Sequence, residues 1–272
     1  MPAYRYGKSY PHDAGAPSVA VENISVQYNG HKALDGITFE LIRGERVAVV
    51  GPNGAGKSTL FKVLAGVLAP QTGRVRLYGG EPSQHICVGY VPQRSQIDLT
   101  FPATVRDVVL MGRYGKIGLL HWPGRRDHRL VEECLQVVNM EHLSNRQIGE
   151  LSGGQQQRVF VARALAQEAE IMLMDEPFTG LDVSSQEDIM HILDELSRRH
   201  VTVLVATHDL NQAASCFTRV MVLNHRLVAF GPPDAVFTSD LLREAYGDQL
   251  RLVETANGTL ALNNIGCCGG QQ

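Results

Sequence analysis

Short runs of apolar residues alternate along the chain with longer segments in which apolar residues recur at helical spacing. Several of the short runs are apolar at nearly every position, which is typical of parallel strands covered on both faces. The predicted buried strands are Arg46–Val50, Cys87–Val91, Ile171–Met174 and Val201–Ala206. Further strands are predicted near 19–28 and 36–42, as an antiparallel edge, and near 219–223 and 226–230. The pattern predicts an α/β fold with a mainly parallel sheet.

Residues 94–150 interrupt the strands with a mostly helical pattern. Thr104 and Asp107 stand three apart, as in a capping box that begins a helix. Over 126–140 the apolar residues fall on one side of a helix, and we expect this stripe to be core. Its members are Leu130, Val131, Cys134, Leu135, Val137 and Val138. The pattern predicts an inserted helical subdomain over about 94–165.

The rest of the chain resumes the sheet. Ser184 and Glu187 are predicted to cap a helix, and Pro232-Pro233-Asp234 to start a terminal one. The predicted organisation is a loosely ordered arm over 1–18, the main domain over 19–240, and an appendage with a flexible tail over 241–272.

Composition limits the class of protein. The 272 residues, 44% of them hydrophobic, can bury a full α/β core with an inserted subdomain. A net charge of −3 gives no general attraction to nucleic acid, and no nucleic-acid partner is expected. No apolar stretch approaches the ~20 residues that span a bilayer, and the N-terminus lacks an apolar signal core. We therefore expect a cytosolic protein that reaches a membrane only through a partner. Five scattered cysteines fit reduced thiols in that compartment.

The run from Gly51 to Ser58 fits the full phosphate-loop pattern G-x-x-x-x-G-K-[ST], between a predicted strand and a predicted helix. The glycines let backbone N–H groups converge on an anion, and the helix start adds positive potential. Lys57 is expected to reach the β- and γ-phosphates, and the Ser58 hydroxyl to bind Mg²⁺. The residues predicted to bind nucleotide here are Gly51, Pro52, Asn53, Gly54, Ala55, Gly56, Lys57, Ser58 and Thr59.

Polar side chains stand where three other predicted strands end. Because open parallel sheets bind ligands beyond the carboxyl ends of their strands, we expect these side chains beside the phosphate loop. Asp175 is predicted to hold Mg²⁺ through water, and Glu176 to polarise the water that attacks the γ-phosphate. His208 is predicted to contact the γ-phosphate. Gln93 is predicted to bind Mg²⁺ or water and to report phosphate occupancy to the segment behind it. Solvated acids in a turn and a satisfied surface histidine are the competing structural interpretations.

Residues 151–155 read Leu-Ser-Gly-Gly-Gln and open a predicted helix. Ser152 and Gln155 are spaced as a capping box, and Gly153 and Gly154 leave the first turn bare to face an anion. The chain already has one phosphate cradle. The economical arrangement is therefore a head-to-tail dimer, in which each such helix covers the γ-phosphate held by the other copy and two ATP molecules are buried. An ordinary capped helix would explain Ser152 and Gln155 but not the glycines.

The ordered set of motifs, from about Val19 to Phe237, resembles the nucleotide-binding subunits of ABC transporters. The resemblance implies the ABC ATPase fold with a P-loop NTPase core, hydrolysis of ATP with Mg²⁺, and membrane permease subunits as partners. It also implies that adenine stacks on Tyr28 and that Gln93 couples nucleotide to the membrane partner. Asp182 closes Thr179-Gly180-Leu181-Asp182, where the family often has Ser-Ala-Leu-Asp, and is implied to line the nucleotide site.

Two stretches, 105–120 and 178–182, are similar to importers of manganese, zinc or iron. This implies a peripheral subunit on the cytoplasmic face of the cell membrane, served through its permease by an extracytoplasmic metal-binding protein. The segment Arg94–Tyr114 directly follows Gln93 and is the expected docking site for the permease. A soluble ABC ATPase in iron–sulfur assembly or another non-transport process is the alternative. A non-catalytic binding module is disfavoured because the residues for hydrolysis are all present.

Overall fold

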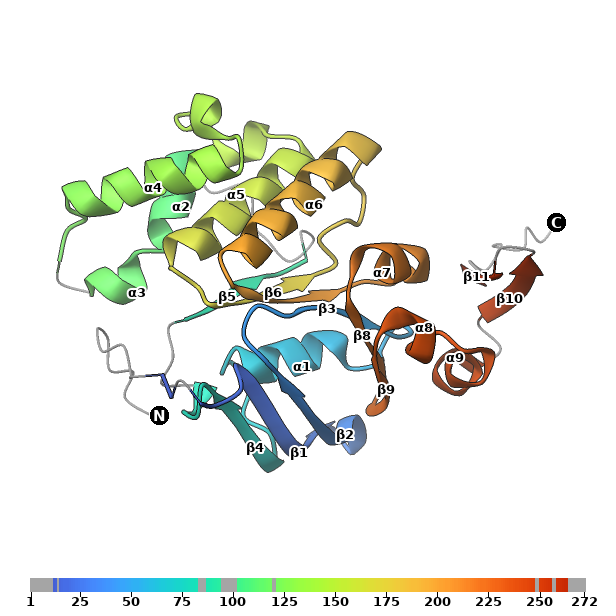
Figure 1. Cartoon of the computed structure of the whole chain (residues 1–272). Coiled ribbons are helices and arrows are strands. Elements are labelled where there is room, and N and C mark those ends of the chain that lie inside the picture. Colours follow the sequence, from blue (N-terminus) through green and yellow to red (C-terminus); the bar gives the residue numbers. More distant parts are fainter. Residues whose placement is uncertain are drawn as a thin grey trace.

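The computed structural model is built around a six-stranded sheet (Figure 1). It describes residues 12–13, 15–82, 87–93, 102–118 and 121–247, and the backbone of two further strands at 250–255 and 258–263. The strand order is β5-β6-β7-β3-β8-β9, in which the first five strands are parallel and β9 is antiparallel to β8. The strands are β3 (Arg46–Val50), β5 (Val88–Val91), β6 (Ile171–Asp175), β7 (Thr202–Ala206), β8 (Arg219–Asn224) and β9 (Arg226–Gly231).

Both faces of this sheet are covered. Successive residues of a strand point to opposite faces. In β3, Val47 and Val49 belong to one core cluster, whereas Ala48 and Val50 belong to the other. Burial on two sides explains why these strands are apolar at almost every position.

An antiparallel sheet, in the order β2-β1-β4, covers one side with α1 (Lys57–Leu64) between the two sheets (Figure 1). Its strands are β1 (Val19–Tyr28), β2 (His31–Leu41) and β4 (Thr72–Leu77). The edge predicted near 36–42 is longer than expected, because Asn29 and Gly30, with φ of 48° and 84°, form a tight turn that joins β2 directly to β1.

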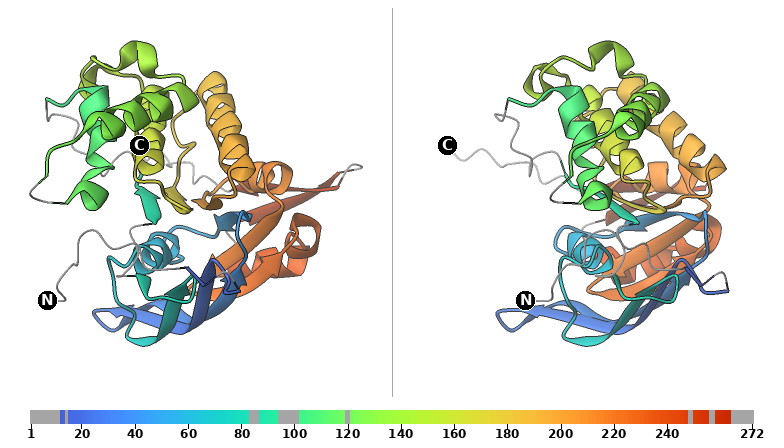
Figure 2. Two further views of the ribbon diagram at one scale, coloured as in Figure 1. Left: turned by 60° about the vertical axis from the view of Figure 1, so that its left-hand side comes forward. Right: turned by 90° about the vertical axis from the view of Figure 1, so that its left-hand side faces the viewer.

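A layer of helices covers the other side, and Figure 2 shows it separated from the antiparallel sheet by the central strands. The helices are α2 (Val105–Met111), α3 (Tyr114–Ile117), α4 (Arg125–Val137), α5 (Gly153–Ala166) and α6 (Val183–Arg198), with 3-10 turns at Glu141–Leu143 and Ile148–Glu150. The capping box of Thr104 and Asp107 is confirmed. The apolar stripe of α4 is confirmed as core, with Val131, Cys134 and Leu135 buried.

One predicted helix start is wrong, and one predicted helix is shorter than expected. The helix assigned to a Ser184–Glu187 cap begins at Val183, because Asp182 has extended backbone and its side chain accepts a bond from the Ser185 N–H at 2.7 Å. The start predicted at Pro232-Pro233-Asp234 is confirmed, since Pro233 is the first residue of a helix, but that helix ends at Val236 and a separate helix capped by Thr238 follows. The remaining elements are α7 (Leu210–Cys216), α8 (Pro233–Val236), α9 (Ser239–Tyr246), β10 (Leu250–Thr255) and β11 (Gly258–Asn263). Among the described residues, no helix is long and apolar enough to cross a membrane.

Candidate functional site

The phosphate loop connects β3 to α1 and is held between two other parts of the chain. A Cβ placed on Gly56, whose φ is 99°, would collide with the carbonyl oxygen of Ala33, and one on Gly51 would collide with that of Leu223. From the β8–β9 turn, the His225 N–H donates to the Ala55 carbonyl at 2.9 Å. Only glycine permits such close packing at the two ends of the loop, so its backbone is held ready for a ligand.

Lys57, the first residue of α1, is buried inside this loop. Its Nζ donates to the carbonyl oxygens of Gly51 at 2.7 Å and Pro52 at 3.1 Å. Burial lowers the pKa of Lys57, and the charges of Glu176 and Asp175 oppose that shift. A cation desolvated in a loop of this geometry fits a bound polyphosphate.

Asp175 ends β6 at the same edge of the sheet and is buried. Burial raises the pKa of Asp175, whereas a hydrogen bond with the Ser58 side chain opposes the rise. The Tyr90 hydroxyl, on neighbouring β5, donates to Asp175 Oδ2 at 3.4 Å. A carboxylate beside a hydroxyl is a set of hard oxygen donors, so these side chains fit Mg²⁺.

Glu176 lies one residue further out, with a positive φ of 52°. Its Oε2 lies 2.7 Å from Nδ1 of His208, which follows β7, and accepts a hydrogen bond from Thr179 Oγ1 at 3.1 Å. The pairing of β6 with β7 brings Glu176 and His208 together, as the sequence predicts for adjacent strand ends. The arrangement places an oriented carboxylate beside the phosphate loop.

Two further predicted residues stand around this edge. Gln93 follows β5 by two residues and is half-buried, whereas 94–101 of the predicted docking segment lie outside the described residues. Tyr28 ends β1 with 47% of its surface exposed, in the hairpin whose Ala33 contacts Gly56. An exposed ring at that position is free to stack on a base.

Ser152 caps α5, and the capping box with Gln155 is confirmed. A Cβ on Gly154 would collide with Oγ of Ser185 and lie 2.6 Å from its Cβ. Gly154 therefore allows α5 to pack closely on α6 within one chain. This structural reason for a glycine was not predicted from the sequence. The helix α5 lies on the opposite face of the central sheet from α1 (Figure 1).

Asp182, predicted to line the nucleotide site, caps α6 instead of pointing at the loop of its own chain. The Ser185 backbone N–H, with a further hydrogen bond from its side chain, lowers the pKa of Asp182. The Asp182 carboxylate therefore serves as the cap of α6 in this chain. A contact with the nucleotide of a second copy would have to be made in addition to this cap.

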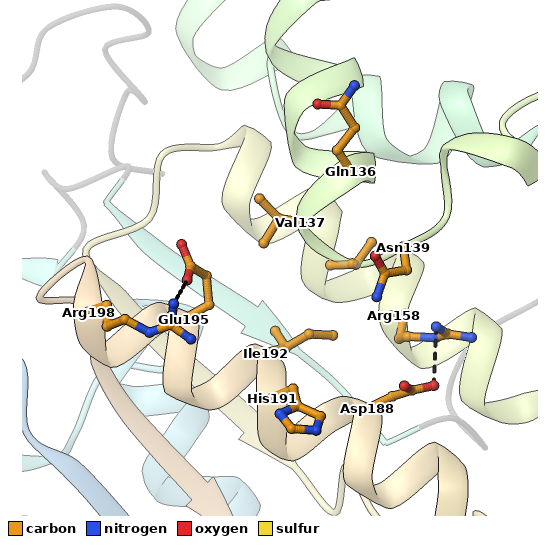
Figure 3. Close-up of a pocket in the computed structure, with 10 residues that line it drawn as sticks. Gln136, Val137, Asn139, Arg158, Asp188, His191, Ile192, Glu195 and Arg198 are labelled. Carbon is orange, nitrogen blue, oxygen red and sulfur yellow. Dashed lines mark ion pairs between the residues drawn. The ribbon is translucent and has the colours of Figure 1, made fainter.

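A hollow of about 460 Å³ lies between the end of α4 and α6, away from the phosphate loop (Figure 3). Its charged groups are paired, with Arg158 Nη1 3.2 Å from Asp188 Oδ2 and Arg198 Nη1 2.8 Å from Glu195 Oε2. Paired charges give it no strong attraction for a phosphate, so the nucleotide site belongs at the loop instead.

Three contacts in the site were not predicted. The Thr179 hydroxyl donates a hydrogen bond to Glu176, and the Tyr90 hydroxyl donates one to Asp175. The His225 backbone N–H donates one to the phosphate loop. The contact of Thr179 could have been predicted, because Thr179 follows Glu176 by three residues in a turn, which brings the two side chains close together. The other two depend on strand pairing over long sequence separations, which spacing does not reveal.

Comparisons with known proteins agree with the geometry. The family model described as "ABC transporter" matches residues 34–179. The manganese transport system ATP-binding protein MntB of Halalkalibacterium halodurans is 45% identical over 91% of this chain and 99% of its own. The zinc transport system ATP-binding protein TroB of Treponema pallidum is 44% identical over 87% and 90%. A dimeric ATP-binding cassette solved in a post-hydrolysis state with ADP and Pi has a TM-score of 0.68 and 28% identity, over 79% of this chain and 98% of that one.

Proposed function

This chain belongs to the ABC transporter family as an ATP-binding subunit, and we propose that it powers the uptake of a divalent metal: manganese, zinc or iron. The observation that carries the cargo class is the 44–45% identity, over most of both chains, to subunits named for manganese and zinc transport. The chain hydrolyses ATP as part of a membrane transporter. A soluble role in iron–sulfur assembly is not favoured by these relatives.

The nucleotide is assigned to the phosphate loop. The backbone N–H groups of the loop 51–59, in which Pro52 has none, and the ammonium of Lys57 bind the phosphates, with Lys57 exchanging its two carbonyl partners for phosphate oxygens. The exposed ring of Tyr28 stacks on adenine. Ser58, Asp175 and Gln93 would hold Mg²⁺, which when bound neutralises charge on the β- and γ-phosphate oxygens.

Glu176 is assigned as the residue that activates water. As the water oxygen forms a bond to the γ-phosphorus, the bond to the β–γ bridging oxygen breaks and ADP departs. The water proton passes to Glu176, which later releases it to solvent. His208, whose Nδ1 lies 2.7 Å from Glu176 Oε2, is assigned to orient the carboxylate and to contact the γ-phosphate.

The chain acts as a dimer, and we assign the head-to-tail form to it. The start of α5, with Ser152, Gly153, Gly154 and Gln155, covers the phosphate held by the other copy. Asp182, beside that contact, lies in the loop that would meet the second copy. Each site is complete only when two chains meet, so hydrolysis is coupled to their separation.

The transporter's permease is the membrane partner, and the chain is membrane-associated through it. The proposed finer arrangement is the cytoplasmic face, contact through the segment after Gln93, and delivery of metal to the permease by an extracytoplasmic metal-binding protein. The described part 102–114 of that segment includes Met111 and Tyr114, both with exposed apolar surface. Such surface suits a protein contact.

Metal uptake in a deletion strain tests the function. The strain is complemented with the wild-type chain, with Glu176→Gln, or with an empty vector, and accumulation of manganese, zinc and iron is measured separately. Restoration of one metal by the wild-type chain alone is expected. Equal accumulation of all three metals in every strain would contradict the cargo assignment. Recovery of the tagged chain from detergent extracts with soluble partners only would contradict the transport role.

A further inference from the structure

The backbone of Glu176 is held by hydrogen bonds on two sides. Its backbone has the left-handed φ of 52°, which non-glycine residues rarely adopt, and its N–H donates to the Ala206 carbonyl of β7 at 3.0 Å. The Thr179 N–H in turn donates to the Glu176 carbonyl at 3.3 Å, closing a turn. The backbone at this point is therefore fixed by contacts on both sides.

The side chain of Glu176 is also held, through only one of its two carboxylate oxygens. Oε2 is bonded to Thr179 Oγ1 at 3.1 Å and lies 2.7 Å from Nδ1 of His208. Among the hydrogen bonds of the described residues, none reaches Oε1. A carboxylate oxygen has two lone-pair sites, so these two partners fill Oε2. The terminal torsion of a glutamate is broad, and a single partner would leave the plane of the carboxylate free to turn.

We propose that Thr179 is a positioning residue for Glu176: its hydroxyl and His208 together hold Oε2, which leaves Oε1 to face the attacking water. This rests on the proposed role of Glu176. Thr179 itself is exposed, so its hydroxyl is not needed to satisfy a buried group and serves the carboxylate instead. The hydroxyl is the required feature, because a serine at this position would supply the same donor.

Two matched variants test the proposal. Thr179→Val keeps the branched shape and removes the hydroxyl, whereas Thr179→Ser keeps the hydroxyl. The full chain, co-purified with its permease, is assayed for steady-state hydrolysis of MgATP. We expect kcat to fall about tenfold in Thr179→Val, on the scale of one hydrogen bond to a charged group, with KM for ATP within about twofold of wild type. Thr179→Ser should retain at least half of the wild-type kcat.

A Glu176→Gln variant in the same assay separates the two levels of inference. If Glu176→Gln hydrolyses ATP normally, the proposed role of Glu176 is wrong and the role of Thr179 goes with it. If Glu176→Gln is inactive and Thr179→Val has the wild-type kcat, only the positioning role is overturned. Equal losses in Thr179→Val and Thr179→Ser would also overturn it, because shape rather than the hydroxyl would then matter. A rise in KM with unchanged kcat would assign Thr179 to ATP binding instead.

Discussion

Replacing Arg113 with methionine should destabilise the helical layer without touching the nucleotide site. The Arg113 side chain is only 8% exposed and connects three segments. Its Nε donates to Asp127 at 3.0 Å, in the first turn of α4, and its Nη1 donates to the Ala166 carbonyl at 2.9 Å and to Glu168 at 2.7 Å, at the end of α5. Methionine fills similar volume but leaves these acceptors without their donor.

The loss of stability in Arg113→Met depends on which partners Asp127 and Glu168 keep after the substitution. Removing one partner of a buried ion pair costs about 3–5 kcal/mol when the other is left uncompensated. Here Asp127 keeps a bond from the Gly124 N–H at 2.9 Å. Glu168 is 44% exposed and keeps Lys116 at 2.6 Å. We therefore expect Arg113→Met to lower the free energy of unfolding by about 2–3 kcal/mol and the melting temperature by about 5–10 °C for a chain of this size.

The assay is thermal unfolding of the purified chain, with Arg198→Met as the matched control. Arg198 is 73% exposed and pairs with Glu195 on its own helix, so the control should change the free energy of unfolding by less than about 0.5 kcal/mol. If Arg113→Met melts within 1–2 °C of the control, by the scale of about 2–4 °C per kcal/mol, the network contributes little and the reasoning is refuted.

The same contacts set a pH dependence. Burial works against ionisation of Asp127 and is the largest single influence, but bonds from the Gly124 N–H and Arg113 outweigh it and lower the pKa of that carboxyl. A carboxyl with a lowered folded pKa stabilises the protein above its unfolded pKa, about 4, and loses that contribution as the pH falls through the folded value. The difference in melting temperature between wild type and Arg113→Met should be constant from neutral pH down to about pH 5 and shrink below about pH 4.

Three further predictions concern the nucleotide site. Glu176→Gln should abolish hydrolysis yet retain ATP, so a stable dimer is expected by size-exclusion chromatography with MgATP; normal turnover would remove Glu176 from its role. Lys57→Ala should weaken nucleotide binding, measured by calorimetry, because a buried cation is lost; unchanged affinity would contradict the loop assignment. Tyr28→Ala should cost about 1 kcal/mol of ATP affinity, the low end for base stacking because the ring is 47% exposed, and a loss for ATP without a matching loss for triphosphate would support stacking on adenine.

The central sheet could be predicted because its physical signal is local. Strands covered on both faces must be apolar on both faces, and β3, β6 and β7 carry that signal over four consecutive residues each. Chain order alone does not give the strand order, yet the rule that ligands bind at the carboxyl ends of parallel strands sufficed to predict Asp175 near Lys57 and His208 beside Glu176. The coulombic influence of Asp175 on Lys57 reflects that proximity.

What spacing could not reveal was which of several capable side chains is used. Asp182 and Ser184 are both residue types that cap helices. Asp182 is the cap in the structure, because its extended backbone puts the carboxylate within reach of the Ser185 N–H. Thr179 was noted only as a departure from a common motif, whereas its contact with Glu176 depends on a turn that begins with a left-handed residue. No propensity favours glutamate in that conformation, and the surrounding hydrogen bonds impose it.

The single chain also constrains how a second copy could complete the site. The helices α1 and α5 lie on opposite faces of the sheet, with the buried strand β3 in the layer between them, so the two helix starts cannot close on one phosphate without opening that core. Gly154 packs against Ser185. In the head-to-tail dimer that we propose, the first-turn N–H groups and Ser152 would meet the nucleotide of the second copy. The Ser152 oxygen accepts from the Gln155 N–H, but a hydroxyl can accept and donate at once. The hydrogen bond that starts the helix therefore leaves the Ser152 proton available to an acceptor on a second copy.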